Sequence, residues 1–168
     1  MRFQVKNSVT IFCDDHVFWP RDFLSHILAP FSDPTVGIVG TTKRVRRTTF
    51  ALSLTAFCNV LGCLYLEQHN FDLRASSAVD SGCFVMSSRI LALRTQIVST
   101  PAFLWKFTNE MTFFELVGPL NADDDNFVTR WMFNHGWKTA WQDADDACIE
   151  TTIGDDEGGF TKLMAQNV

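Results

Sequence analysis

The sequence lacks the short motifs by which several large enzyme classes are recognised. It has no Walker loop, no GxGxxG, no GxSxG nucleophile motif and no cysteine–histidine spacing typical of a zinc site. Its five cysteines include no CxxC pair, so we expect buried, reduced thiols and not a disulfide framework. Any chemistry of this chain must therefore depend on residues outside these motifs.

Long uninterrupted hydrophobic stretches are also scarce. The longest apolar stretch, residues 50–66, is broken by Ser53, Thr55, Asn59 and Gly62, so it falls short of a membrane span. We expect an amphipathic helix there, which either packs on a sheet or lies at a membrane surface. The N-terminal residues lead almost directly into a strand and predict no signal peptide.

An excess of positive charge is missing as well. The 168 residues carry a formal net charge of −5, which argues against a nucleic-acid partner held by its phosphates. The basic run at residues 43–47 is a local exception. Apolar residues make up 46% of the chain, which favours a globular domain over a disordered segment. The length suits a single domain, and we assign residues 1–168 to one.

Apolar runs alternate with helical periodicities along the chain, which is typical of an α/β fold. We expect strands at residues 9–13, 36–40, 83–86, 137–141 and 147–152. We expect helices after Pro20, over 48–74 with Leu54, Phe57, Cys58 and Leu61 on one face, from Ser87 through Ile97, over 101–117, and from the acids at 123–125 to near Gly136. The first two strands would pair in parallel across the first helix.

The first of these strands ends abruptly in Asp14, Asp15 and His16. Ligands of open α/β sheets bind just beyond the carboxyl ends of strands, and these side chains suit a divalent cation such as Mg²⁺ or Mn²⁺. An Asp-rich turn that only begins the next helix accounts for the three residues equally well.

Two further charged clusters have both a structural and a functional interpretation. Lys43 and Arg44 open the basic run, which is either a solvated edge segment or a clamp for a diphosphate or another anionic substrate. Asp123, Asp124 and Asp125 precede a helix, where one acid would serve as a cap. Three adjacent acids exceed that need, and crowding raises the pKa of a carboxyl group, which suits a general base.

The order of these motifs resembles the catalytic domain of family-2 glycosyltransferases. The segments are Asp14-Asp15-His16, Ser81-Gly82-Cys83-Phe84, Ala122-Asp123-Asp124-Asp125-Asn126-Phe127 and Trp137-Lys138-Thr139-Ala140-Trp141. The likeness is greatest to processive polysaccharide synthases: hyaluronan, chitin and cellulose synthases and related fungal enzymes. Residues 14–16 match the family's DxD position with His16 in the third place, and Gln166 matches the start of its QxxRW motif. The resemblance implies a GT-A-like fold, a mixed and mostly parallel sheet flanked by helices, without its N-terminal βα unit.

The resemblance also implies an activity and a role for each residue. The reaction would be an inverting transfer of a sugar from a UDP-sugar donor to a growing polysaccharide acceptor. Asp14 and His16 would hold Mn²⁺ or Mg²⁺, and Asp14, Asp15, Lys43 and Arg44 would bind the nucleotide sugar. Asp125 would be the general base, with Asp124 shaping its pKa, and Ser81, Gly82 and Gln166 would line the acceptor path.

The resemblance further implies membrane association through segments outside this chain, with the catalytic domain facing the cytosol. The net charge, as noted above, predicts no nucleic-acid partner. Two alternatives remain open on the sequence. The chain could be a catalytically inactive fragment of such a synthase, or a metal-dependent hydrolase of nucleotide sugars that uses the same acids.

Overall fold

A computed structural model describes residues 6–46, 54–80, 85–86, 89–111 and 124–152. Within these residues the strands form a four-stranded sheet of order β1-β5-β3-β6 and a three-stranded sheet of order β2-β7-β4. The larger sheet contains β1 (Val9–Cys13), β5 (Ile90–Arg94), β3 (Val36–Thr41) and β6 (Lys138–Gln142). The smaller sheet contains β2 (Val17–Phe18), β7 (Ile149–Thr151) and β4 (Lys43–Val45).

The larger sheet is mixed. Strand β5 runs antiparallel to both of its neighbours, β1 and β3, whereas β3 and β6 are parallel. Strands β1, β3 and β6 therefore run in one direction and β5 runs against them. This arrangement confirms the mixed, mostly parallel GT-A-like sheet, but β1 and β3 do not pair directly as expected, because β5 lies between them.

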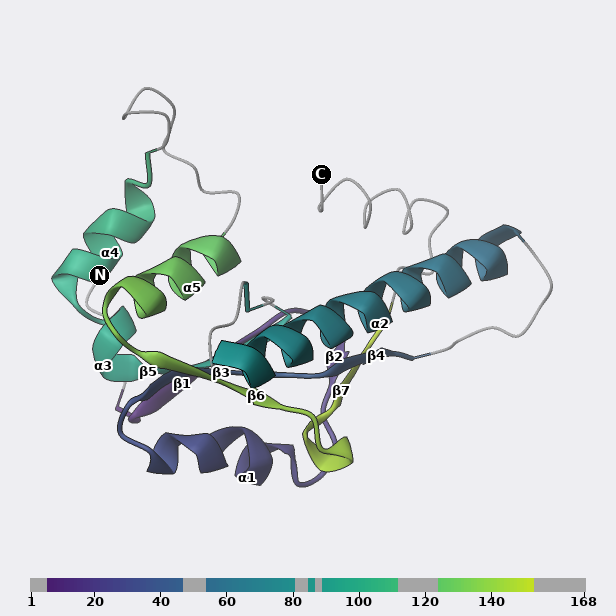
Figure 1. Cartoon of the computed structure of the whole chain (residues 1–168), viewed down its shortest axis with the longest axis horizontal. Coiled ribbons are helices and arrows are strands. Elements are labelled where there is room, and N and C mark those ends of the chain that lie inside the picture. Colours follow the sequence, from purple (N-terminus) through teal and green to yellow (C-terminus); the bar gives the residue numbers. More distant parts are fainter. Residues whose placement is uncertain (1–5, 47–53, 81–84, 87–88, 112–123, 153–168) are drawn as a thin grey trace.

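Helices cover both faces of the larger sheet (Figure 1). On one face lies α1 (Phe23–Leu28), which continues into the short helix η1 (Ala29–Ser32). On the other face lie α2 (Leu54–Asp80) and α5 (Asp124–Asn134), with α4 (Pro101–Thr108) packed on α5. The short helix α3 (Thr95–Val98) follows β5, and η2 (Asp145–Ala147) precedes β7.

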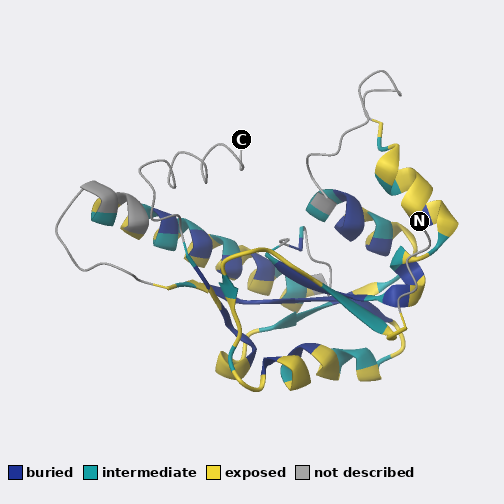
Figure 2. Cartoon of the chain, turned by 180° about the vertical axis from the view of Figure 1, so that it is seen from behind, coloured by how far each residue is buried: buried dark blue, intermediate teal, exposed yellow. Residues whose placement is uncertain are grey.

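Two hydrophobic cores result, one on each side of the larger sheet. The α5 side contains Ile38, Leu93 and Met132, and the α1 side contains Ile27, Val39 and other residues. Neighbours along β3 thus point to opposite cores, as the alternation of side chains along a strand requires. Figure 2 shows the buried residues along the strands and along one side of α2, the longest helix.

The predicted helix from Ser87 through Ile97 is wrong over most of its described length. Residues Ile90–Arg94 form strand β5, and only Thr95–Val98 are helical. Strand β5 lies inside the sheet with helices on both faces, so all of its residues from Ile90 to Leu93 are buried. A strand buried on both faces is a continuous apolar run without alternation, which periodicity alone does not distinguish from a buried helix.

Four other expectations need correction. The helix expected over residues 101–117 ends at Thr108, and residues 109–111 are not helical. Residues 85–86 form no strand, and residues 83–84 lie outside the described part of the chain. Phe57 does not face the sheet, because its side chain is 60% exposed, and the buried side of α2 follows Gly62, Leu66, Asn70 and Leu73 instead. Cys13 is exposed, whereas Cys148 is buried as expected.

Other predictions are confirmed. Strands β1, β3, β6 and β7 lie where their apolar runs predict them, and α5 ends two residues before Gly136. Gly136 has a φ of +73°, a conformation that glycine adopts without strain at the end of a helix. Among the described residues, no helix combines the length and the apolar character needed to cross a membrane.

Candidate functional site

Four of the acidic residues that the sequence singles out, Asp14, Asp15, Asp124 and Asp125, lie at one end of the larger sheet. Asp14 to His16 follow the carboxyl end of β1. Helix α5 connects to β6 through residues 135–137 and packs against β3 and β6, so it returns antiparallel to β6. Its first residues, Asp124 and Asp125, therefore lie toward the carboxyl ends of β1, β3 and β6 (Figure 1). Strand β1 is three strand spacings from β6, roughly 14 Å across the sheet.

The turn after β1 holds its side chains toward solvent. The Asp14 N–H donates to the carbonyl of Arg89 at 3.1 Å, which extends the β1–β5 pairing by one residue. His16 has a φ of +59°, a left-handed conformation that is uncommon outside glycine. Its Nε2 lies 3.3 Å from Asp15 Oδ2, and the two side chains are 69% and 90% exposed. A carboxylate and an imidazole thus converge in a position that a ligand can reach.

The Asp15–His16 pair suits an open metal site, which substrate and water complete, and not a closed site built from protein ligands alone. Within the described residues, no group of three or more His, Cys, Asp or Glu side chains could hold a metal ion by itself. A closed, all-protein metal centre is therefore not formed by these residues. Mg²⁺ in nucleotide sites is typically held by one or two carboxylates, with substrate phosphates and waters as the remaining ligands. The Asp15–His16 pair, with Asp14 beside it in sequence, fits that open arrangement.

Asp125 lies in the first turn of α5, where a negative charge is stabilised by the free N–H groups of the helix. Its side chain is half-buried. One turn later, the Oγ1 of Thr129 accepts a hydrogen bond from the Met86 N–H at 3.0 Å, and Thr129 and Met86 are both buried. The chain at Met86 is thereby attached to the acid-bearing end of α5.

A short segment joins the two acidic elements. It begins with Met86, bonded to α5 through Thr129, and ends with Arg89, whose carbonyl accepts from Asp14. The predicted acceptor residues Ser81 and Gly82 precede this segment in sequence, but they and Gln166 lie outside the described residues. The structure thus connects the Asp14–His16 turn to the start of α5.

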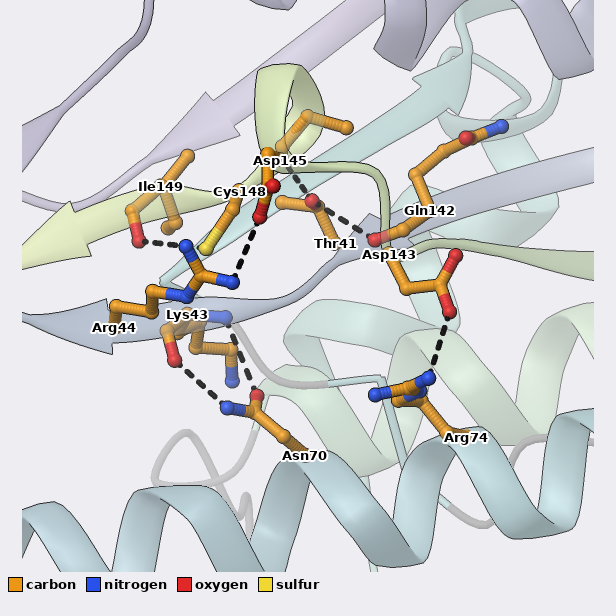
Figure 3. Close-up of polar contacts among 11 residues, drawn as sticks. Thr41, Lys43, Arg44, Asn70, Arg74, Gln142, Asp143, Asp145, Cys148 and Ile149 are labelled. Atoms are coloured by element: carbon orange, nitrogen blue, oxygen red, sulfur yellow. Dashed lines mark hydrogen bonds and ion pairs between the residues drawn. The ribbon is translucent and has the colours of Figure 1, made fainter.

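The side chain of Lys43 is not accessible at the end of the sheet where the acidic residues lie. Its side chain is 1% exposed and points from β4 toward α2 (Figure 3). The amide of Asn70 on α2 bonds the main chain of Lys43 twice, as acceptor from the N–H at 3.2 Å and as donor to the C=O at 2.7 Å. Burial, and then the charge of Lys43, lowers the pKa of the neighbouring His69. In this arrangement the Lys43 side chain is not exposed to a ligand.

Arg44 points to the other side of β4, because successive residues of a strand alternate. Its Nη2 lies 2.8 Å from Asp145 Oδ1 on η2 (Figure 3), and this hydrogen bond raises the pKa of the guanidinium further. Thr41 fixes the same region, since its hydroxyl donates to the carbonyl of Ala147. Lys43 and Arg44 therefore do not form one clamp, and their donor-binding role stays a prediction.

Sequence reasoning missed Arg89. The residue lies in the stretch interpreted as a helix, and no motif marks it. In the structure it stands opposite Asp14 across the β1–β5 pair, and its Nη1 donates to the Oγ1 of Thr151 at 3.0 Å. Only the placement of β5 beside β1 reveals this position.

Comparison with known proteins agrees with the geometry. Residues 1–164 match the family model described as glycosyltransferase-like family 2. A Type 2 glycosyltransferase of Gibberella zeae is 45% identical over 150 residues, which cover 89% of this chain and 28% of that protein. A Type 2 glycosyltransferase of Pyricularia oryzae is 40% identical over 152 residues, 90% of this chain and 31% of that protein.

A more distant relative, the NDP-glycosyltransferase ltbB of Aspergillus luteorubrus, is 28% identical over 151 residues, 88% of this chain and 36% of that protein. The chain thus spans about a third of the length of the curated relatives that it matches.

Proposed function

Since the chain belongs to the glycosyltransferase-like family 2, we propose that it forms the donor-binding and catalytic part of an inverting transferase. The enzyme transfers a sugar from a UDP-sugar to a growing polysaccharide. The observation that supports this most directly is the position of the Asp14–His16 turn and of Asp125 at the same end of one sheet, joined through Met86 and Arg89.

In this proposal the turn after β1 binds the donor's diphosphate. Asp14 and His16 hold a divalent cation, Mn²⁺ or Mg²⁺, and Asp15 supports His16 through the contact described above. Held there, the ion would supply positive charge to offset that of the departing nucleoside diphosphate. An imidazole in place of the third carboxylate favours Mn²⁺ over Mg²⁺, because Mg²⁺ prefers oxygen ligands.

Asp125 acts on the acceptor. Its carboxylate takes the proton of an acceptor hydroxyl while that oxygen forms a bond to the anomeric carbon of the donor sugar. The bond from that carbon to the diphosphate breaks on the opposite side, so the configuration inverts. The separation of β1 from the strands beneath α5, roughly 10–14 Å, leaves room for a sugar ring between the diphosphate and the base.

Metal-dependent UDP binding tests the donor site. Calorimetry on the chain with and without MnCl₂ is compared with the variant Asp15→Ala/His16→Ala. A matched control is His26→Ala/Asp146→Ala, because these residues form a second histidine–aspartate pair, 3.9 Å apart and away from the turn. We expect binding that needs the metal, disappears in the first variant and persists in the control. No binding by the folded chain, or equal binding by all variants, contradicts the donor site.

Product analysis separates transfer from hydrolysis. With a labelled UDP-sugar and oligosaccharide acceptors, a transferase lengthens the acceptor as UDP is released. Release of free sugar without acceptor lengthening would support the hydrolase alternative. Polysaccharide as the acceptor, membrane association and a cytosol-facing orientation stay predictions of the resemblance.

A further inference from the structure

We propose that Arg89 binds the diphosphate of the nucleotide-sugar donor, so that the donor site contains a fixed guanidinium beside the Asp14–His16 turn. This inference rests on the proposed function and adds a residue to it. Three observations carry it: the position of Arg89 opposite Asp14, its attachment to Thr151, and the lack of a neutralising carboxylate among the described residues.

Arg89 lies next to the turn by strand pairing. The register of β1 and β5 places Cys13 opposite Ile90, and the hydrogen bond from the Asp14 N–H to the Arg89 carbonyl continues it. Residues opposite each other in an antiparallel pair project to the same side of the sheet, with Cβ atoms about 5 Å apart. The guanidinium of Arg89 and the carboxylate of Asp14 therefore leave the sheet on the same side.

The second sheet fixes the far end of the Arg89 side chain. Its Nη1 donates to Thr151 Oγ1 at 3.0 Å, and Thr151 is 0% exposed. Thr151 lies on β7 opposite Val17, the residue that follows His16. Arg89 thus faces the residue at the start of the turn, and its hydrogen-bond partner faces the residue just after the turn. The guanidinium is held at the base of the turn, between the two sheets.

Among the described residues, no carboxylate forms an ion pair with Arg89. Within the described residues, four arginines form ion pairs with acids: Arg44 with Asp145, Arg46 with Glu150, Arg74 with Asp143 and Arg130 with Glu110. Arg94 donates to three main-chain carbonyls. Arg89 donates one of its five N–H groups to a neutral hydroxyl.

A guanidinium held in this way suits a phosphate. Its remaining N–H groups form a planar fork that matches phosphate oxygens. Lys43 and Arg44, the cations that the sequence suggests for this role, are directed to α2 and to Asp145. Arg89, by contrast, is a cation that strand pairing places beside the turn that would receive the diphosphate.

The test compares a ligand that has the diphosphate with one that lacks it. The affinity of the whole chain for UDP is measured by calorimetry in MnCl₂, and its affinity for uridine by NMR titration, with the variant Arg89→Met beside the unaltered protein. We expect Arg89→Met to weaken UDP binding by about 10- to 100-fold, the effect of losing charged hydrogen bonds, and to leave uridine binding within about twofold. Arg74→Met is the matched control, because it removes one surface arginine whose charge is already paired with Asp143.

Other outcomes separate this inference from the proposed function. Equal weakening of UDP and uridine, or no weakening of either, overturns the role of Arg89 and leaves the donor site standing. A failure of the unaltered chain to bind UDP overturns the donor site, and the role of Arg89 with it. Should Arg89→Met not fold, Arg89→Lys keeps the charge without the fork. We then expect about a 3- to 10-fold loss for UDP alone, and equal losses for both ligands overturn the inference.

Discussion

The side-chain amide of Asn70 forms its two hydrogen bonds with the main chain of one residue, Lys43. Strand β4 is an edge strand of the smaller sheet. Main-chain groups next to Lys43, such as the C=O of Thr42, form hydrogen bonds with β7. The N–H and C=O of Lys43 point away from β7, where an edge strand has unpaired groups. The amide of Asn70 satisfies both groups, much as another strand would, and so attaches α2 to the edge of the sheet.

We predict that Asn70→Ala destabilises the protein by about 2–4 kcal/mol, because it leaves a buried donor and a buried acceptor without partners. Equilibrium unfolding in urea measures the change. Asn134→Ala is the control, since Asn134 is exposed on α5, and we expect it to stay within about 0.5 kcal/mol of the unaltered protein. Similar losses for the two variants would contradict the role of Asn70.

We predict that stability falls on mild acidification because of His69. Burial and the charge of Lys43 lower the pKa of His69 in the folded state below its ordinary value of 6.5. The unfolded chain then binds a proton that the folded chain does not. The contribution of His69 is thus complete above pH 6.5 and is lost as the pH falls from 6.5 through the lowered pKa.

Unfolding free energies over this range check the prediction, with His69→Gln as the comparison. The glutamine variant is expected to show a smaller loss of stability below pH 6.5 than the unaltered protein. Identical pH profiles for the two proteins would show that other groups cause the acid sensitivity.

We predict that His16→Gly stabilises the fold and abolishes metal-dependent UDP binding. At a φ of +59°, a residue with a Cβ is strained by about 1 kcal/mol, and glycine is not. Thermal unfolding and calorimetry measure the two effects. Asp15→Gly serves as the control. Among the described residues other than glycine, only His16 has a positive φ, so glycine relieves no strain at position 15 and is expected to destabilise the fold there. A loss of stability in His16→Gly would argue against strain in this turn.

We predict that Asp125→Asn lowers the rate of sugar transfer by about 10²- to 10⁴-fold, since an amide does not accept the proton of the acceptor hydroxyl. The affinity for UDP is expected to be unchanged, because the diphosphate binds at the other side of the site. Transfer from a labelled UDP-sugar gives the rate, and calorimetry gives the affinity. A parallel loss of rate and affinity would place Asp125 in the donor site instead.

The parts of the fold that the sequence predicted are those with local causes. The run Val9–Cys13 is rich in β-branched residues and ends at two acids, and helix α5 begins at acids and ends near a glycine that adopts a positive φ. Strand β5 has no such local cause. Its four apolar residues are compatible with a buried helix, and only pairing with β1 and β3, far away in sequence, makes them a strand.

The candidate site divides in the same way. Residue type and neighbours were enough to single out Asp14, His16 and Asp125. The positions of Lys43 and Arg89 depend on tertiary structure. The side chain of Lys43 on β4 is buried against α2, and the pairing of β5 with β1 places Arg89 opposite Asp14. A basic residue in a basic run was therefore a poor guide, and an isolated arginine before an apolar run gave no indication of its position.

The central position of β5 also dictates when the larger sheet can form during synthesis. Strands β1 and β3 leave the ribosome first, but each pairs with β5, and β6 pairs with β3. A nascent chain that ends before residue 90 contains the residues of β1 and β3 but lacks β5, the strand that pairs with both. Until β5 emerges, their unpaired edges are available to other chains, which is where aggregation begins for proteins that depend on contacts between distant residues.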